Sequence, residues 1–308
     1  MNQNIDESLN YVASLIVTYN PSSSDYNSVS SCLGKLGGII VIDNSSDSIA
    51  RSNLVKFIES IHSTTKVHLV LNEKNLGLSK AYNLGISLAR SQGFQYLILM
   101  DQDSYFLENS IAELYNAYEI MRSQGFNGVV SPTVILKKGN IDSIFSRFFD
   151  NTSRRIHKWF ENNYVMQSRF AINSGTFLPL NIIKDKTFYD EELFTDGIDI
   201  LFCYKLTAMK LYIFRSKQSR IIHNEHANFF KIGELILPIF LYSTDRIYHI
   251  VHDYLTLFQK TYRSRFFFVL YHLLTMSLSL LINVIFRRNR GQIIRNVGRA
   301  IDDWINFH

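Results

Sequence analysis

Four short apolar runs, each closing on Asn, Asp or Ser, alternate with segments of helical periodicity in the first third of the chain. The runs are YVASLIVTYN, GGIIVIDNSS, VHLVLNEKN and FQYLILMDQDS. They are apolar almost throughout, as strands buried on both faces are. The segments between them, SDYNSVSSCLGKL, SIARSNLVKFIESI and LSKAYNLGISLARSQG, repeat apolar residues three and four positions apart. This alternation predicts an α/β fold built on a parallel sheet.

Polar residues stand where each predicted strand ends. They are Thr18 to Asn20, Asp43 and Asn44, Asn72 to Asn75, and Asp101 to Ser104. Ligands of open α/β sheets bind outside the carboxyl ends of the strands, so these residues predict one polar crevice. The alternative for any single site is that its polar side chain caps the helix that follows.

The rest of the chain predicts two further parts. RFAINSGTFLPL and LYIFRSKQSRIIHNEH are strand-like, and DEELFTDGIDILFCYKL predicts a helix that starts near Asp196 to Asp199. From about Glu234 the sequence changes to long aromatic helices. Because 308 residues exceed the usual size of one domain, we expect a catalytic domain over residues 1–233 and a helical region over residues 234–308.

Composition excludes a disordered chain, since hydrophobic residues make up 46% and charged residues only 19%. Cys32 and Cys203 match no metal-finger or redox spacing, so we read both as reduced, non-catalytic thiols. The N-terminus, MNQNIDESLN, has no basic stretch followed by an apolar run, so no secretory signal is expected. These features predict a cytoplasmic location.

Asp101-Gln102-Asp103 is the first pattern that carries a chemical mechanism. Alternate residues of an extended segment face the same way, so the two carboxylates can hold one divalent cation. A cation bound by few carboxylates suits a diphosphate leaving group. His223 ends a strand-like run and could complete the metal shell, although a lone histidine is more often structural.

Two further patterns suggest ligand contacts. Asp43 could accept a hydrogen bond from a base imide or a ribose hydroxyl, or could cap the next helix. Asn75 and Gly77 open the pattern N-x-G-x-x-x-A-x-N, which ends at Asn83, at the start of a helix. Glycine and small residues there permit close approach of a ligand, but ordinary turn chemistry explains them equally.

Acidic residues gather around the predicted helix start at Asp196 to Asp199. The helix dipole stabilises carboxylates in this position and explains most of them. One buried carboxylate facing the crevice would nevertheless serve as a general base for an acceptor hydroxyl. The cluster consists of Asp190, Glu191, Glu192, Asp196 and Asp199.

In order and spacing, these segments resemble the family 2 glycosyltransferases with a GT-A fold. Within that family they resemble the rhamnosyltransferase-like enzymes of bacterial surface polysaccharide synthesis. The resemblance covers residues 12–228 and implies a GT-A sheet flanked by helices. Its elements are IVTYNP, VIDNSS, NEKNLGLSKAYNLGI, LMDQDS, INSGTFLP, LFTDGIDILFCYKL and IIHNEH.

The resemblance implies a role for each matched position. Asp101 and Asp103 look like ligands of Mg²⁺ or Mn²⁺ and of the diphosphate, with His223 as a further metal contact. Ser174 and Gly175 look like a turn beside the donor sugar. The donor-binding set is Thr18, Tyr19, Asn20 and Asp43 at the nucleoside, Asn75, Gly77 and Lys80 at its floor, and Asp101, Gln102, Ser174 and Gly175.

The family carries an acidic motif at its catalytic base, and Ile198-Asp199-Ile200-Leu201 matches it here. The match selects Asp199 as the base, with Asp196 as the fallback, while Leu201 replaces the second acidic position. One base and one cation imply direct displacement with inversion. The implied donor is a dTDP- or UDP-sugar, with dTDP-rhamnose the best candidate, and the implied acceptor is a lipid-linked glycan.

The segment FFFVLYHLLTMSLSLLINVIF, residues 266–286, is flanked by arginines. We expect it to lie in the interface of the cytoplasmic membrane, with aromatic residues in lipid and arginines at anionic headgroups. A packed core or homodimer helix and a true span are the alternatives. Because the arginines flank an apolar run instead of forming a stripe, nucleic acid is not expected as a partner.

Two rival functions share these features. A nucleotidyltransferase also uses an α/β sheet, carboxylates and a metal, but it normally shows a glycine-rich loop where this chain has TYNPSSS. A glycan- or nucleotide-binding scaffold without transfer activity would keep the fold. The Asp199→Asn variant distinguishes that scaffold from an enzyme, because in an enzyme it should bind donor normally but lose transfer.

Overall fold

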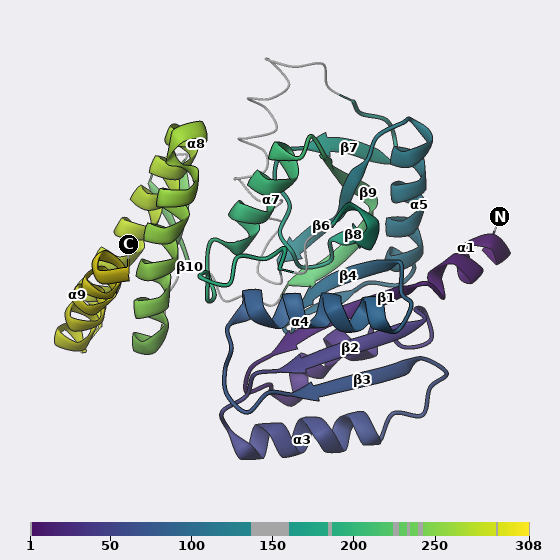
Figure 1. Cartoon of the computed structure of the whole chain (residues 1–308), viewed down its shortest axis with the longest axis horizontal. Helices are drawn as coiled ribbons and strands as arrows, with labels where there is room; N and C mark the ends of the chain where they lie inside the picture. The colour runs from purple at the N-terminus through teal and green to yellow at the C-terminus, as the bar shows by residue number, and fades with distance from the viewer. Residues whose placement is uncertain are drawn as a thin grey trace. The chain divides into compact units, whose positions relative to one another are not determined.

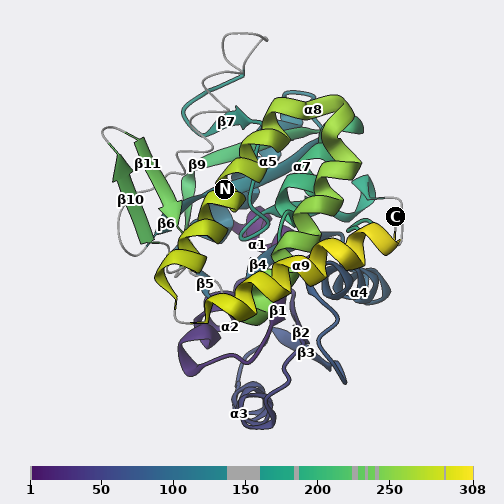
Figure 2. The same cartoon turned by 90° about the vertical axis from the view of Figure 1, so that its left-hand side faces the viewer.

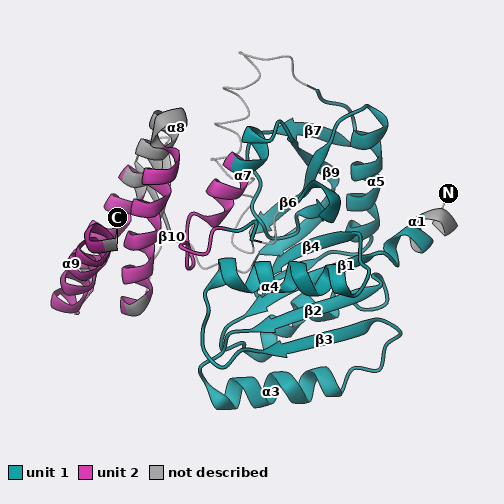
Figure 3. Cartoon of the chain, viewed as in Figure 1, with its two compact units in different colours: residues 1–189, 205–225 teal, residues 190–204, 226–308 magenta. Residues whose placement is uncertain are grey.

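The computed structural model describes residues 2–136, 160–183, 187–223, 228–232, 235–239, 243–287 and 289–307. The chain forms two compact units, residues 1–189 with 205–225, and residues 190–204 with 226–308 (Figure 3). Residues 190–204 therefore group with the C-terminal helices. The predicted boundary at residue 233 stays a prediction.

The first unit contains the four predicted parallel strands (Figure 1). They run side by side in the order β3-β2-β1-β4. Every residue of β2 is buried, which agrees with a run that shows no polar alternation. The strands are β1 (Val12–Thr18), β2 (Gly38–Asp43), β3 (Lys66–Leu71) and β4 (Tyr96–Asp101).

Successive side chains of β1 point to opposite faces of the sheet, and different helices cover the two faces. Val12 and Ile16 belong to a buried cluster with residues of α2 (Asn27–Ser30), α3 (Ser48–Glu59) and α5 (Ser110–Ser123). On the other face, Leu15 lies against Gly85 of α4 (Leu78–Ser91). A Cβ at Gly85 would lie 2.2 Å from Leu15 Cδ1, so glycine lets α4 pack closely. Shorter helices are α1 (Asn2–Leu9), η1 (Ser23–Tyr26) and η2 (Leu180–Ile182).

Beyond β4 the sheet is mixed, and the expectation of a parallel sheet does not extend to this part. The order continues β4-β8-β6-β9-β5, with β7 also paired to β9. β8 runs antiparallel to β4 and β6, and β5 runs antiparallel to β9. The strands of this part are β5 (Ser104–Phe106), β6 (Gly128–Leu136), β7 (Val165–Ser168), β8 (Phe177–Pro179) and β9 (Tyr212–His223).

The second unit contains the loop that starts at Asp190 and the first part of α7 (Ile198–Ala208), up to Tyr204. It also contains the helices α8 (Thr244–Phe286) and α9 (Arg290–Phe307). Figure 2 shows α9 alongside α8, where Tyr248 Oη donates to Asp303 Oδ2 at 2.8 Å. The expectation of helix from about Glu234 is wrong at its start. An antiparallel pair, β10 (Asn228–Ile232) and β11 (Leu235–Ile239), comes first. Pro238 within LILPI disfavours the predicted helix at that point.

Both cysteines are buried and neither forms a disulfide bond within the described residues, and burial raises the pKa of Cys32 to about 11. In the part of the chain that the structure describes, no helix has the length and apolar composition needed to cross a membrane.

Candidate functional site

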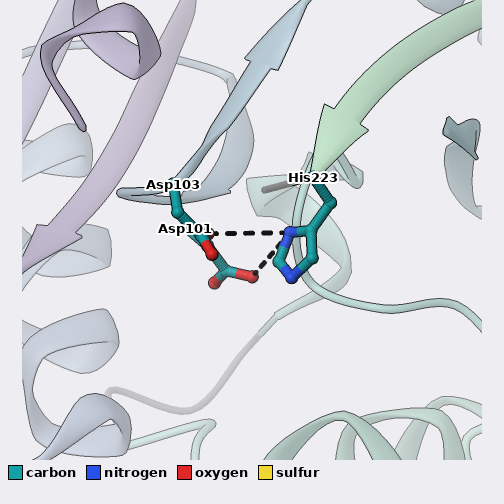
Figure 4. Close-up of side chains that lie close together, drawn as sticks. All are labelled: Asp101, Asp103 and His223. Atoms are coloured by element: carbon teal, nitrogen blue, oxygen red, sulfur yellow. Dashed lines mark ion pairs between the residues drawn. The ribbon is translucent and has the colours of Figure 1, made fainter. Parts of the chain in front are cut away.

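Asp101, Asp103 and His223 come together although the histidine lies far along the chain (Figure 4). Each offers one ligand atom, and these atoms all lie within 4.8 Å of one another. His223 Nδ1 is 3.9 Å from Asp101 Oδ2 and 3.6 Å from Asp103 Oδ1. The antiparallel pairing of β5 with β9 causes this meeting, because it sets Ser104 directly opposite His223.

The donor set fits a divalent cation. The two carboxylates supply the oxygen ligands that Mg²⁺ and Mn²⁺ favour, and the imidazole adds one nitrogen ligand. The two aspartates keep 34% and 32% of their side chains exposed, so they remain open to a ligand. Ser104 Oγ lies 2.6 Å from His223 Nδ1, the ring nitrogen that also faces the two carboxylates, so this contact helps to orient the ring. The sequence placed Ser104 among the polar residues at the end of its strand but did not predict its contact with His223.

The backbone and carboxylate of Asp101 are held from two sides. Tyr82 Oη donates to Asp101 Oδ1 at 3.4 Å, and the amide of Asp101 donates to Ser174 Oγ at 3.3 Å. The predicted turn at Ser174 therefore lies beside the carboxylate pair. Tyr82 was not predicted, although it lies within the segment SKAYNLG that was.

Gly175 is fixed by its backbone conformation. Its φ is +80°, a region that side chains disfavour, and its amide donates to Leu99 O at 2.6 Å. A Cβ here would lie 2.5 Å from Pro132 Cγ. Only glycine fits, so the turn next to Asp101 keeps its shape.

Asp43 is fully buried at the end of β2. Its Oδ1 accepts hydrogen bonds from Thr18 Oγ1 at 2.8 Å and Ser45 Oγ at 2.6 Å. Oδ2 forms an ion pair with Arg51 Nε at 3.3 Å but accepts no hydrogen bond from any described residue. That oxygen keeps acceptor capacity for a nucleoside group, and the predicted nucleoside contact stays a prediction.

The alternative that Asp43 caps the following helix is wrong. Asp47 caps α3, because its Oδ1 accepts from the amides of Ile49 at 2.7 Å and Ala50 at 3.2 Å. The sequence DNSSDS offers several capping residues, and the helix begins after the later aspartate.

Tyr19, Asn20 and Gln102 connect the ends of β1, β2 and β4. The amide of Tyr19 donates to Gln102 Oε1 at 2.7 Å, and the Tyr19 side chain keeps 47% of its area exposed. Asn20 has a φ of 47°, and its Oδ1 accepts from the amides of Ser46 and Asp47. Asn20 and Gln102 thus support the crevice edge, while the exposed ring of Tyr19 is available to a nucleoside.

The segment from Asn75 to Asn83 is held by turn and packing contacts. Asn75 Oδ1 accepts from the amide of Gly77 at 2.9 Å, and Gly77, with a φ of 80°, precedes the first residue of α4. Asn83 exchanges two hydrogen bonds of 2.9 Å with the backbone of Tyr189. The turn-chemistry alternative therefore explains these residues, and Lys80, exposed in the first turn of α4, is the side chain open to a ligand.

Asp199 lies half-buried in the first turn of α7, in the second unit. Its predicted convergence with Asp101 and Asp103 stays a prediction. Ion pairs account for other acidic residues of the cluster. Lys260 Nζ pairs with Asp190 at 2.6 Å and Glu192 at 2.9 Å, and Arg246 pairs with Asp196 at 3.4 Å.

Asp253 is a buried carboxylate that sequence reasoning missed. It is fully buried in α8 and accepts three backbone hydrogen bonds, from Phe194, Thr195 and Asp196, at 2.9, 2.7 and 2.9 Å. Its only signal in the sequence is an aspartate inside the apolar helical stretch IVHDYLTLF.

Known proteins resemble the chain in sequence and in fold. The sequence model described as Glycosyl transferase family 2 matches residues 15–209. The dTDP-rhamnosyl transferase RfbF of Shigella flexneri is 25% identical over 252 residues, which cover 82% of this chain and 81% of that protein. The crystal structure of S. aureus TarS 1–349 in complex with UDP-GlcNAc superposes with a TM-score of 0.51 at 12% identity, covering 94% of this chain and 71% of that one. This last likeness shows a shared fold and confirms the expected GT-A arrangement.

Proposed function

The chain belongs to glycosyl transferase family 2, and we propose that it transfers rhamnose from dTDP-rhamnose, with inversion, to a lipid-linked saccharide of a bacterial surface polysaccharide. The observation that carries this proposal is the gathering of Asp101, Asp103 and His223 beside the Ser174 turn. The named activity of the Shigella flexneri relative supports rhamnose and the dTDP carrier.

Donor binding is assigned to the crevice at the strand ends. Thr18, Tyr19, Asn20 and Asp43 would take the nucleoside, with Asn75, Gly77 and Lys80 at its floor and Gln102, Ser174 and Gly175 nearer the sugar. Asp101, Asp103 and His223 would hold Mg²⁺ or Mn²⁺. A cation bound there supplies positive charge that stabilises the departing diphosphate.

Asp199 is the proposed general base. Its carboxylate takes the proton from an acceptor hydroxyl while that oxygen attacks the anomeric carbon from the face opposite the diphosphate. A new bond forms between the anomeric carbon and the acceptor oxygen, and the bond to the phosphate oxygen breaks. The electron pair of the broken bond leaves with the nucleoside diphosphate. Because attack and departure take place on opposite faces, the anomeric configuration inverts.

A panel of nucleotide sugars tests the substrate assignment. We expect dTDP-rhamnose with Mg²⁺ or Mn²⁺ to raise the thermal midpoint most, because a ligand that binds only the folded state stabilises it. We also expect release of dTDP when a rhamnose-accepting glycolipid is added. The UDP- and GDP-sugars are the matched controls. Equal stabilisation by every nucleotide sugar, or none by any, would contradict the proposed donor.

Membrane attachment is proposed for the second half of α8 and for α9. Four exposed apolar residues lie on one face of α8, at intervals of three and four: Leu274, Leu278, Leu281 and Ile285. The buried residues of the same stretch include Ser279 and Asn283, so this helix turns apolar side chains outward. Such a face needs an apolar partner.

Charge favours an anionic lipid surface as that partner over a second copy of the chain. Exposed arginines follow on α9, at positions 290, 295 and 299, and an anionic leaflet attracts them. Pairing two identical faces would bring these like charges together. The proposed location is therefore the inner face of the cytoplasmic membrane.

Replacing Leu281 and Ile285 by serine is expected to weaken binding to vesicles that contain phosphatidylglycerol. The two side chains are about half exposed, at 55% and 49%. Full burial of such a side chain stabilises by ~2 kcal/mol, so covering the exposed half with lipid would contribute about 1 kcal/mol for each. The pair would lower vesicle affinity about 30-fold. Co-sedimentation measures this, and Ile49→Ser, which removes an isoleucine that is 71% exposed on α3, is the control. Equal binding by both variants would refute attachment through α8.

A further inference from the structure

The loop that leads into α7 is attached to α8 by a single buried carboxylate. Three consecutive amides, of Phe194, Thr195 and Asp196, donate to Asp253 at 2.7 to 2.9 Å. Asp253 has no exposed surface, so solvent does not compete for these hydrogen bonds. Bonds from backbone amides to a charged carboxylate are roughly twice as strong as neutral ones.

Other residues of α8 hold the same loop on either side of Asp253. Arg246, two turns earlier, pairs with Asp196, and Lys260, two turns later, pairs with Asp190 and Glu192. The ring of His249 stacks on Phe194 with centroids 3.9 Å apart and planes 12° apart. The loop is thus fixed along one face of the helix.

The last turn of the loop is shaped by a close approach. Gly197 has a φ of 71°, and a Cβ there would lie 3.1 Å from Leu257 Cδ2 of α8. The next residue, Ile198, begins α7, and Asp199 follows in its first turn. Only Gly197 and Ile198 therefore separate Asp199 from the last residue whose amide Asp253 holds.

We infer that Asp253 is a positioning residue, which sets the direction of the Asp199 carboxylate through the 194–196 loop and the start of α7. The inference rests on the proposed role of Asp199 as the base. A general base must lie within hydrogen-bond reach of the proton it removes, and loops hold such geometry less well than helices do. Asp253 supplies the missing restraint from a helix that α9 braces, where Asn296 Nδ2 donates to Thr244 O at 2.7 Å.

The variant Asp253→Asn tests this inference. It keeps the size of the side chain, but one of the two acceptor oxygens becomes an NH₂ group, so at least one of the three amides loses its acceptor. We expect kcat to fall about 100-fold, the loss that a displacement of about 1 Å at a reacting group causes. The KM for the nucleotide sugar and its thermal stabilisation should stay at wild-type values.

A second substitution distinguishes positioning from a general loss of structure. If Asp253 acts through Asp199, adding Asp253→Asn to Asp199→Asn should leave the residual rate unchanged within about threefold. A further large loss in the double variant, or wild-type kcat in Asp253→Asn, would overturn the inference. Should Asp253→Asn fail to fold, Arg246→Gln decides, because its pair with Asp196 is half-exposed and its loss costs little stability.

The control for Arg246→Gln is Arg122→Gln, which removes an exposed ion pair with Glu119 on α5. We expect a several-fold lower kcat for Arg246→Gln and wild-type kcat for Arg122→Gln, while equal rates would overturn the inference.

Failure of the proposed base and failure of the positioning role give different results. Wild-type transfer in Asp199→Asn would remove the proposed base, whereas an inactive Asp199→Asn beside an unaffected Asp253→Asn would remove only the positioning role.

Discussion

Asparagine at position 199 is expected to abolish most sugar transfer while leaving nucleotide-sugar binding intact. General base catalysis contributes about 10²- to 10⁴-fold, and an amide cannot take up the proton of the acceptor hydroxyl. The loss should therefore appear in kcat, with the KM for the donor unchanged. Steady-state transfer rates measure the first, and the thermal midpoint with and without nucleotide sugar measures the second.

Asp196→Asn is the matched control for that experiment. Asp196 lies three residues earlier in the same loop and pairs with Arg246, so its substitution perturbs the same region without removing the proposed base. We expect Asp196→Asn to retain more activity than Asp199→Asn. The reverse order would assign the base to Asp196. Wild-type rates in both variants would show that another residue acts as the base.

The second large effect is expected at the carboxylate pair. Asp101→Asn or Asp103→Asn should lower transfer about 10²- to 10³-fold, since each removes a group that holds positive charge against the departing diphosphate. The same variants should lose the extra stabilisation that Mg²⁺ or Mn²⁺ gives to bound nucleotide sugar. Thermal shift over a metal titration measures this directly, apart from catalysis.

Ser104→Ala is expected to weaken metal binding less than the aspartate substitutions do. The serine contacts His223 Nδ1 and helps to orient the ring, and hydrogen-bond partners of metal-binding side chains typically change metal affinity about 10- to 100-fold. We expect a weaker metal response that higher metal concentration restores, whereas the aspartate variants should not recover. Asp302→Asn, on an exposed position of α9, is the control. Metal-independent binding and transfer by the wild-type protein would contradict the cation site.

The parallel half of the fold could be predicted because its signal is local. Each strand is an unbroken apolar run, and α4 repeats apolar residues at helical spacing, so β1 to β4 are confirmed close to their expected positions. The predicted family and GT-A fold are likewise confirmed. The strand β11 was read as helix because its residues show neither clear alternation nor a helical stop signal before Pro238.

The sequence predicted those site residues whose type and position in a motif indicate their chemical role. Asp101 and Asp103 are marked by their spacing, and His223 by the end of a strand-like run. Ser104, Tyr82 and Asp253 act through tertiary contacts. These contacts depend on strand register and on the packing of a helix against a loop, so no local pattern predicts them. The sequence could not identify the cap of α3, because several possible capping residues lie close together and Asp47, not Asp43, caps the helix.

The attachment of the 194–196 loop to α8 sets a lower limit on the length of a working enzyme. A fragment cut at residue 209, where the match to the family model ends, would retain Asp101, Asp103 and Asp199. It would lose His223, and it would also lose Asp253, which holds the loop before Asp199. Bracing of α8 by Asp303 carries that requirement almost to the C-terminus. We therefore expect a chain truncated before α9 to lose transfer activity even in an assay without membranes.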